Sequence, residues 1–273
     1  PKIQDGTLRK NLVEPPWHCP DEYLNLPIHM RQFEMELLTP KAADNGEVVL
    51  QLHGGGYIAK IRNAYRDFAV RYSKIDQYRV LSVDYRVAPQ HPYPAAFQDA
   101  LEAYRWLLYS GFSGDRIILA GDSAGGGLVL ALAMYLRDQS MPLPKKLVMM
   151  SPWTDLTASG PSYQENYEND PLFGNTRESM IYNGEYAGKQ DPKLPYISPL
   201  FGDFHGLPPM LFQVGSLEML LSDSVLAAQK AKEAGCDVTL TVYQDMFHVF
   251  QLSMDKLAES RAAWDEVAAF LGK

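Results

Sequence analysis

One serine of this chain lies between two glycines, in residues 121–125 (Gly-Asp-Ser-Ala-Gly), directly after the apolar run 117–120. A strand that turns abruptly into a helix forces the residue at the bend into strained backbone geometry, and only small residues two positions away leave room for it. Such a bend lifts the Ser123 hydroxyl clear of the sheet, where a nucleophile for acyl transfer is needed. The same pentapeptide also occurs as an ordinary glycine-rich turn, so the surrounding residues must decide.

Three consecutive glycines follow the apolar run 48–52, in residues 53–56 (His-Gly-Gly-Gly). A backbone without side chains can turn its N–H groups toward a developing negative charge on oxygen, as an oxyanion hole does. A flexible turn or a phosphate-binding loop would also use glycines. A phosphate loop, however, has a Lys-Ser/Thr pair or a Gly-x-Gly-x-x-Gly spacing, and neither is present. With Ser123 downstream, the pattern favours an oxyanion-binding loop.

A general base is expected at His248, within residues 245–250, just past the last predicted strand. Most histidines in proteins are structural or solvated, so position decides between them. A loop between the final strand and the final helix is where a fold with the chain order serine, acid, histidine presents its base. The other five histidines lie in the N-terminal region, the glycine motif or proline-rich loops: His18, His29, His53, His91 and His205.

The acid that orients this histidine is expected on the loop after the strand at 210–214, in residues 215–223. Glu218 comes early in this loop among apolar neighbours, an unusual setting for a merely solvated carboxylate. Asp223 fits better as the N-cap of the next helix. We therefore favour Glu218 as the acid and keep Asp223 as the alternative.

The elements that must position these residues alternate between short apolar runs and longer helical patterns, which predicts parallel strands joined by crossover helices. Strands are expected at 80–83, 117–120, 147–150, 210–214 and 238–243, and helices near 63–76, 95–109, 124–138, 223–234 and 255–271. Asn-Gly at 45–46 is a strong turn signal between an extended segment at 33–38 and the run 48–52. Those two runs are expected to form a hairpin.

Two segments depart from this rhythm. Residues 1–30 are rich in proline and are expected to form a partly helical N-terminal arm and partial cap. Residues 153–208 contain no convincing core strand and are expected to be a cap insertion, partly helical around 177–186, over one face of the sheet. The predicted domain organisation is therefore a single catalytic domain from residues 31–152 and 209–273, interrupted by that insertion.

Composition limits the classes of function. The 273 residues are 46% hydrophobic and 21% charged, with a formal net charge of −8, so we expect a globular protein with no nucleic-acid partner and no anionic-membrane surface. No apolar run approaches the roughly 18 residues of a membrane span. Cys19 and Cys236 are far apart, outside any metal-like or redox-like spacing, and predict a reduced, cytoplasmic protein without a metal site.

These motifs together resemble the hormone-sensitive-lipase-like carboxylesterases of the α/β-hydrolase fold. The resemblance runs from about residue 48 to the C-terminus and rests on five stretches in the family's order: 53–56, 84–89, 91–96, 121–126 and 151–155. It implies a mostly parallel central sheet flanked by helices, with a small cap from the N-terminal arm and the 153–208 insertion. Only 52 residues precede His53, fewer than the family's helical N-terminal cap usually needs, so the insertion is expected to supply most of the cap.

The resemblance also implies the role of each site residue. Ser123 is the nucleophile, His248 the general base, and the oxyanion is held by the N–H groups of Gly55, Gly56 and Ala124. Glu218 stands where the family more often has the first Asp of Asp-Pro-Leu-Arg-Asp, and its extra methylene makes it a departure from that pattern. No metal or organic cofactor is needed for the two-step acyl-enzyme mechanism that follows.

The substrate is expected to be a small ester with a short acyl chain, because the residues that could line the pocket are largely aromatic: Tyr57, Phe173, Tyr182, Tyr186, Phe247 and Val249. Two other functions use the same scaffold. An amidase or peptidase would share every catalytic residue, whereas a non-catalytic small-molecule receptor would lack the histidine base that is present here. Pairing of two copies through the last strand or the last helix, at an exposed sheet edge, is a further expectation.

Overall fold

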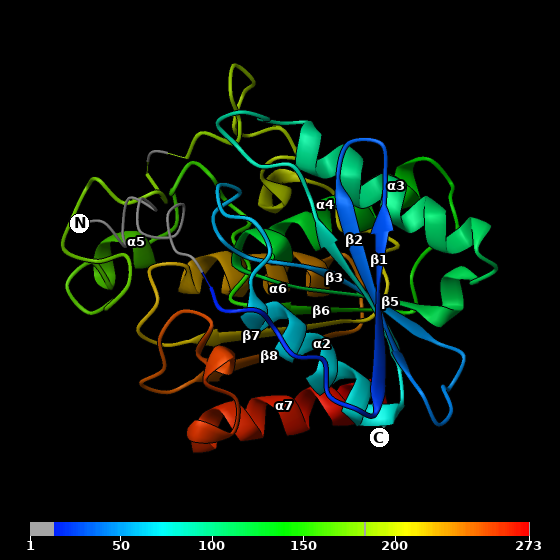
Figure 1. The fold of residues 1–273 in the computed structure, drawn as a ribbon. Helices are drawn as coiled ribbons and strands as arrows, with labels where there is room; N and C mark the ends of the chain where they lie inside the picture. Colours follow the sequence, from blue (N-terminus) through cyan, green and yellow to red (C-terminus); the bar gives the residue numbers. More distant parts are fainter. Residues whose placement is uncertain (1–13, 183, 273) are drawn as a thin grey trace.

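The computed structural model describes residues 14–182 and 184–272, and its centre is one eight-stranded sheet (Figure 1). The strands are β1 (Tyr23–His29), β2 (Glu34–Pro40), β3 (Val48–Leu52), β4 (Arg79–Asp84), β5 (Ile117–Asp122), β6 (Lys146–Met150), β7 (Met210–Gly215) and β8 (Val238–Tyr243). Their order in the sheet is β1-β2-β4-β3-β5-β6-β7-β8. Strands β3 to β8 run parallel, and β1 and β2 run antiparallel at one edge.

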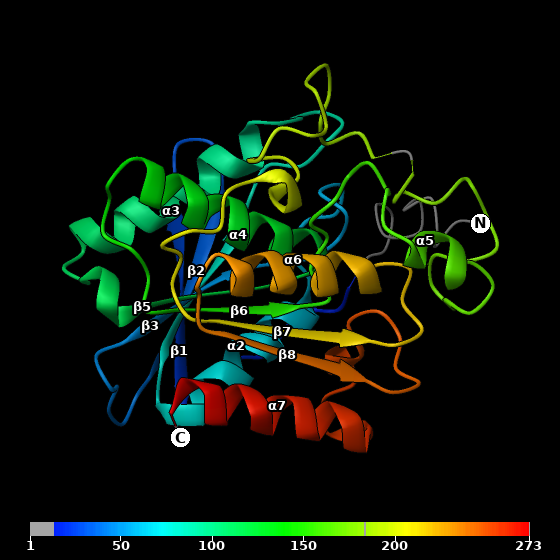
Figure 2. The ribbon, with the colours of Figure 1, turned by 180° about the vertical axis from the view of Figure 1, so that it is seen from behind.

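Helices cover both faces of this sheet (Figure 2). On one face pack α3 (Ala95–Tyr109), α4 (Ser123–Asp138) and α6 (Leu221–Glu233); on the other pack α2 (Asn63–Asp76) and α7 (Ala258–Leu271). Every residue of β3, β5 and β7 is buried, as expected of parallel strands covered on both sides. Because parallel strands all end on the same side of the sheet, the loops after β3, β5, β7 and β8 meet at the carboxyl ends of these strands.

The predicted parallel strands and their helices are confirmed, including the strand-to-helix junction at β5 and α4. The last helix differs from the expectation, because residues 250–256 form a separate 3₁₀ segment, η3 (Phe250–Lys256), before α7 begins. Met254 has non-helical backbone angles and kinks η3 internally, and the extended Leu257 separates η3 from α7. The expected helix from residue 255 is therefore correct only from Ala258.

Two expectations about the N-terminal part were wrong. The segment 33–38 does not form a hairpin with β3: β2 pairs antiparallel with β1 and with β4. The partial burial of β2 suits a place near the lateral edge of the sheet, whereas the fully buried β3 suits a place inside it, between the parallel strands β4 and β5. Within the expected N-terminal arm, β1 is a strand of the sheet and not a helix, and its Pro27 is tolerated because β1 is an edge strand.

Part of the expected arm, residues 1–13, lies outside the described residues. The boundary at residue 30 also separates two strands that the structure pairs. The division into an arm (1–30), a catalytic domain (31–152 and 209–273) and a cap (153–208) otherwise stays a prediction. No helix in residues 14–182 or 184–272 combines the length and the apolar character needed to cross a bilayer.

The insertion at 153–208 is built from turns. Among its described residues, the regular elements are one short helix, α5 (Ser162–Glu165), and one 3₁₀ turn, η2 (Pro199–Phe201). The helix expected around 177–186 was wrong, because the described residues of that stretch form turns. Gly184 packs against the Trp153 ring so closely that a side-chain carbon there would lie 3.0 Å from it. Contact with Trp153, at the start of the insertion, thus outweighs helix propensity in this stretch.

Candidate active site

Ser123 is the first residue of α4 and stands at the bend after β5. Its φ of 51° is in the left-handed region, which is strained for a residue with a side chain. The flanking glycines are required by contact: a Cβ at Gly125 would lie 2.0 Å from the Leu52 carbonyl oxygen, and one at Gly121 would lie 2.5 Å from that of Gly125. The close approach of β3 and α4 thus holds the serine at the end of the sheet.

A chain of hydrogen bonds links the three residues expected to form the catalytic group. The His248 Nε2 atom lies 2.9 Å from the Ser123 hydroxyl oxygen, and the His248 Nδ1 atom lies 2.8 Å from Glu218 Oε2. All three side chains are buried, with Glu218 fully so. In this geometry Nδ1–H donates to the carboxylate, which leaves Nε2 free to accept the serine proton.

The second carboxylate oxygen of Glu218 is held by two further donors. Its Oε1 atom accepts a hydrogen bond from the Ser151 hydroxyl (2.7 Å) and one from the Gly215 N–H (2.5 Å). The Ser151 hydroxyl oxygen in turn accepts the Val249 N–H at 3.1 Å. One serine at the end of β6 therefore joins the acid loop to the loop that contains His248.

Asp223, the alternative acid, faces a different partner. Its Oδ2 atom accepts the N–H groups of Thr154 and Asp155 at 2.7 and 2.8 Å, where the chain enters the insertion. Burial, reinforced by the charge of Asp155, raises the pKa of the Asp223 carboxyl well above its usual range. Of the two candidate acids, only Glu218 is hydrogen-bonded to His248.

The glycine loop after β3 is fixed from below by the residue before Ser123. The Asp122 carboxylate accepts the Gly54 N–H at 2.9 Å and the Tyr65 hydroxyl at 3.2 Å. Gly55 and Gly56 then turn with positive φ values of 118° and 65°. Neither of their N–H groups donates to an acceptor within residues 14–182 or 184–272. The loop therefore presents unused donors beside the elbow, as the expected oxyanion hole requires.

His53 supports this loop. Its Nδ1 atom lies 2.7 Å from the Gly54 carbonyl oxygen, and its ring stacks on Tyr85 with 4.1 Å between centroids. Burial lowers the pKa of His53, so its imidazole is neutral and donates Nδ1–H to that carbonyl. The Tyr85 hydroxyl donates to the His53 carbonyl oxygen at 2.5 Å. Both contacts orient the peptide units that lead into Gly55.

The residues expected to line the pocket fall into three groups. Phe173 lies edge-on against the His248 ring, with 4.8 Å between centroids. Tyr57 and Tyr186 are buried and stack on each other at 3.7 Å. The others lie around these groups: Tyr182, half-buried with its hydroxyl on the Tyr163 carbonyl oxygen, Phe247, half-buried, and Val249, buried. Phe173 is thus the member that contacts the hydrogen-bonded group directly.

Several residues around the site were not singled out from the sequence. Ser151 follows an apolar strand, and its place at the carboxyl end of β6 was the available signal. Met180, from the insertion, covers the glycine loop: its sulfur lies 2.4 Å from the point where a Cβ of Gly56 would be. Asn166 and Asp170, also from the insertion, hydrogen-bond the loop of Glu218. No local pattern marked these three, because their partners are distant in sequence.

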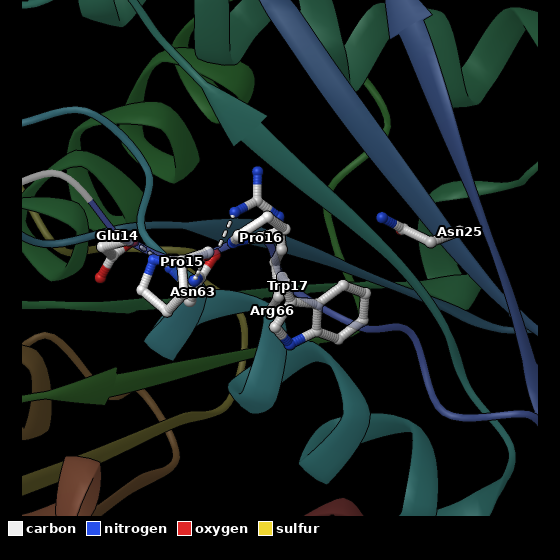
Figure 3. A pocket seen from close by; sticks show the side chains of 7 residues that line it. All are labelled: Glu14, Pro15, Pro16, Trp17, Asn25, Asn63 and Arg66. Atoms are coloured by element: carbon white, nitrogen blue, oxygen red, sulfur yellow. Dashed lines mark hydrogen bonds between the residues drawn. The ribbon is translucent and has the colours of Figure 1, made fainter.

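A separate hollow of about 410 Å³ lies beside the start of α2 (Figure 3). Its lining residues are Glu14, Pro15, Pro16, Trp17, Asn25, Asn63 and Arg66. Arg66 is already bound to Glu36 and to the Asn63 side chain. In the described ranges, no group of three or more His, Cys, Asp or Glu residues could hold a metal ion. The Ser123 site remains the group with evident chemistry.

Known proteins are similar to this chain in sequence and in fold. A model of the α/β-hydrolase fold matches residues 49–252. An acetyl-hydrolase of Streptomyces hygroscopicus is 39% identical over 230 residues, which cover 84% of this chain and 77% of that protein. Among solved structures, an esterase from the bacterial hormone-sensitive lipase family has a TM-score of 0.87 at 38% identity, covering 98% of this chain and 88% of that one.

A second solved structure, EstE5 soaked with p-nitrophenyl butyrate, has a TM-score of 0.85 at 36% identity and covers 99% of this chain and 97% of its own. These matches span the sheet, the elbow and the histidine loop together. They confirm the fold and the resemblance inferred from the five sequence stretches. The chain belongs to the α/β-hydrolase fold family, in its branch of hormone-sensitive-lipase-like carboxylesterases, which are carboxylic ester hydrolases.

Proposed function

We propose that this protein is a serine carboxylesterase that hydrolyses esters of short acyl chains through an acyl-enzyme intermediate. The observation that supports this most directly is the unbroken hydrogen-bonded chain from Ser123 through His248 to Glu218. A nucleophile, a base and an acid that orients the base are the three groups that such a mechanism needs. Family membership supports the same reaction class.

In the first step, the Ser123 oxygen attacks the ester carbonyl carbon while its proton passes to His248 Nε2. The negative charge that develops on the carbonyl oxygen is stabilised by the N–H groups of Gly55, Gly56 and Ala124. His248 then protonates the leaving alkoxide, which departs as the alcohol. The Glu218 carboxylate holds Nδ1–H throughout and stabilises the imidazolium that forms.

In the second step, water attacks the carbonyl carbon of the acyl-enzyme and gives its proton to His248. The same backbone donors stabilise the second tetrahedral intermediate. When this intermediate collapses, the bond to Ser123 breaks, the proton returns to the serine oxygen and the carboxylic acid leaves. Every proton transfer in the cycle is therefore to or from His248.

The preference for short acyl chains is supported by two side chains of the insertion. Met180 packs on Gly56 of the glycine loop, and Phe173 packs on His248, so both bound the space above Ser123. Bulky groups this close to the reacting serine leave little room for a long acyl chain. Two of the similar proteins are an acetyl-hydrolase and an esterase soaked with a butyrate ester, which agrees with this size.

The test combines labelling with a substrate series. A fluorophosphonate probe should label the wild type and not Ser123→Ala, and Ser123→Ala should lose about 10³-fold or more of the hydrolysis of p-nitrophenyl butyrate. Against acyl chains of two to twelve carbons, kcat/KM should be highest at two to four. Full activity in Ser123→Ala would refute the mechanism, and a maximum at long chains would refute the size preference.

Matched ester and anilide substrates separate esterase from amidase or peptidase, which would use the same residues. Comparable turnover of the anilide would overturn the ester assignment. A non-catalytic receptor on this scaffold would show no turnover of either substrate. The retained contact of His248 with both Ser123 and Glu218 favours catalysis over that alternative.

We also propose that the protein is cytoplasmic and that two copies pair through β8. Both cysteines, Cys19 and Cys236, are free thiols, as a reducing compartment would keep them. β8 is the last strand in the sheet order, and its Val242 is an exposed apolar side chain. An unpaired edge with an apolar side chain favours strand pairing between copies. Sedimentation of the wild type beside Val242→Lys tests the pairing.

A further inference from the structure

The buried Asp170 carboxylate lies between the insertion and the loop of Glu218. Its Oδ1 atom accepts the N–H groups of Leu172 and Phe173, at 2.8 and 2.9 Å. Its Oδ2 atom accepts the N–H of Met219 at 2.8 Å. A carboxylate that accepts several N–H groups in a buried setting is held firmly, because each charge-assisted bond is stronger than a neutral one. Asp170 therefore fixes three peptide units.

Two of those peptide units belong to residues beside His248. Met219 directly follows Glu218, whose carboxylate holds His248 Nδ1. Phe173 packs edge-on against the His248 ring. One carboxylate thus controls the approach of both an acid and an aromatic ring to the same imidazole, without contacting that imidazole itself.

The turn that contains Asp170 is held closed by its own contacts. The Asn166 side-chain amide donates to the carbonyl oxygens of Ser216 and Glu218, at 2.9 and 2.7 Å. The Asp170 N–H donates to the Asn166 carbonyl oxygen at 2.9 Å. A Cβ at Gly174 would lie 2.4 Å from the Tyr167 carbonyl oxygen, so the turn closes without room for a side chain there. The insertion therefore hydrogen-bonds the acid loop through two residues, Asn166 and Asp170.

We propose that Asp170, supported by Asn166, is a positioning residue that sets the place of Glu218 and Phe173 around His248. This inference rests on the proposed function, because it assigns a role in the same catalytic group. Replacing Asp170 by Asn puts an amide NH₂ where one carboxylate oxygen now accepts N–H, so one side of the contact is lost. Small displacements of catalytic groups reduce turnover strongly.

Asp155 supplies a matched control. It is a fully buried aspartate of the same insertion, and its carboxylate accepts the N–H groups of Thr157 and Ser159 at 2.8 and 2.9 Å. The hydrogen bonds of its carboxylate within the described residues go to Thr157 and Ser159, and none goes to Glu218, Met219 or Phe173. Asp155→Asn therefore imposes a similar loss of buried hydrogen bonds while leaving the hydrogen bonds of Glu218 and of the Met219 N–H in place.

The experiment measures kcat and KM for p-nitrophenyl butyrate and the Tm of Asp170→Asn and Asp155→Asn. We expect similar decreases in Tm. Asp170→Asn should lower kcat about 10- to 100-fold with little change in KM, whereas Asp155→Asn should change kcat less than about threefold. Equal losses of kcat in the two variants would overturn the proposal, since they would show a general effect of instability.

A double-mutant cycle with Glu218→Gln tests whether Asp170 acts through that residue. We expect Asp170→Asn to lower kcat less than about threefold in the Glu218→Gln background, because the group that it positions is already disabled. Losses that multiply would overturn the proposal. If Asp170→Asn does not fold, Asn166→Ala takes its place in the same cycle, with the same two outcomes.

This design separates failure of the inference from failure of the proposed function. Labelling of Ser123 and its loss in Ser123→Ala establish the serine mechanism independently of Asp170. With that mechanism in place, an Asp170→Asn variant that behaves like Asp155→Asn refutes only the positioning role. Without serine-dependent turnover, the proposed function fails first.

Discussion

The carboxyl end of the sheet and the insertion hold their parts of the site by different means. At the carboxyl end of the sheet, Ser123 is placed by main chain packed on main chain, with no room for a side chain at Gly121 or Gly125. In the insertion, which has little regular structure, buried carboxylates bind main-chain N–H groups, as Asp155 and Asp170 do. Substitutions at the carboxyl end of the sheet should therefore affect rate and folding directly. Those in the insertion should act indirectly, on selectivity, on local stability or, at Asp170, on the placement of Glu218 and Phe173.

The largest expected effect distinguishes Glu218, which is hydrogen-bonded to His248, from Asp223, which is hydrogen-bonded to the start of the insertion. In Glu218→Gln the amide NH₂ can donate to His248 Nδ1, which places the imidazole proton on Nε2 and prevents that atom from accepting the serine proton. We expect kcat for p-nitrophenyl butyrate to decrease about 10³- to 10⁴-fold. Asp223→Asn, the control, should retain kcat within about tenfold. The opposite ranking would make Asp223 the acid.

A steric test at the elbow addresses the main-chain packing directly. Gly125→Ala places a Cβ 2.0 Å from the Leu52 carbonyl oxygen, and both groups belong to backbone that cannot easily move. We expect a loss of about 3 kcal/mol in the free energy of unfolding. In the control Gly235→Ala, no heavy atom lies within 4 Å of the new Cβ. It should cost only the left-handed backbone, about 1–2 kcal/mol. Urea unfolding of both variants measures the difference, and equal losses would remove the steric argument.

A smaller effect is expected where the insertion covers the glycine loop. Met180→Ala should raise kcat/KM for p-nitrophenyl octanoate relative to the acetate by about tenfold, because the thioether packed on Gly56 is removed. The ratio between two substrates cancels any loss of folded enzyme. Leu194→Ala, at an exposed side chain of the same insertion, is the control and should leave the ratio unchanged. An unchanged ratio in Met180→Ala would place the acyl chain elsewhere.

The smallest effect concerns the pH dependence of stability at the base of the insertion. Burial and the nearby Asp155 raise the pKa of Asp223 in the folded protein, so the folded state keeps a proton that the unfolded chain releases. Wild-type stability therefore decreases as pH rises from about 4, the usual aspartate pKa, toward the raised pKa. Asp223→Asn lacks this term, so its Tm relative to the wild type should increase with pH, by about 2–4 °C in total.

Thermal unfolding of the wild type and Asp223→Asn at a series of pH values from 4 to 9 measures this difference. Titratable groups common to both proteins cancel, apart from Asp155, which feels the charge of Asp223 directly. A difference in Tm that stays constant with pH would show that Asp223 is ionised in the folded protein over this range. Asp223 would then serve only to hold the N–H groups of Thr154 and Asp155 in place.

Most of the fold was predictable because parallel strands buried on both faces are apolar over their whole length, and this is visible locally. The strands that were missed or misplaced lie at the antiparallel edge. β1 contains Pro27 and its residues are mostly exposed or half-buried without regular alternation, so they resemble an irregular segment until β2 is known to be its partner. The segment 177–186 was misjudged because its packing on Trp153 is a long-range contact.

The candidate site was predictable where chain order limits the choices. Ser123 and His248 follow predicted strands, and the fold places such positions at one edge. The choice of Glu218 over Asp223 was only favoured, since both lie on one loop and only their long-range contacts differ. Asp170 gave no local signal, because the Met219 N–H that it accepts is 49 residues away in sequence.

The hydroxyl of Ser151 has a consequence for exchanging parts between relatives. It donates to Glu218 and accepts from the N–H of Val249, so three separate stretches of chain meet at one oxygen atom. A chimera that imports only a new acid loop, or only a new histidine loop, would keep a serine suited to the old pair. The end of β6, the acid loop and the histidine loop therefore form one structural unit, and a chimera should exchange all three together.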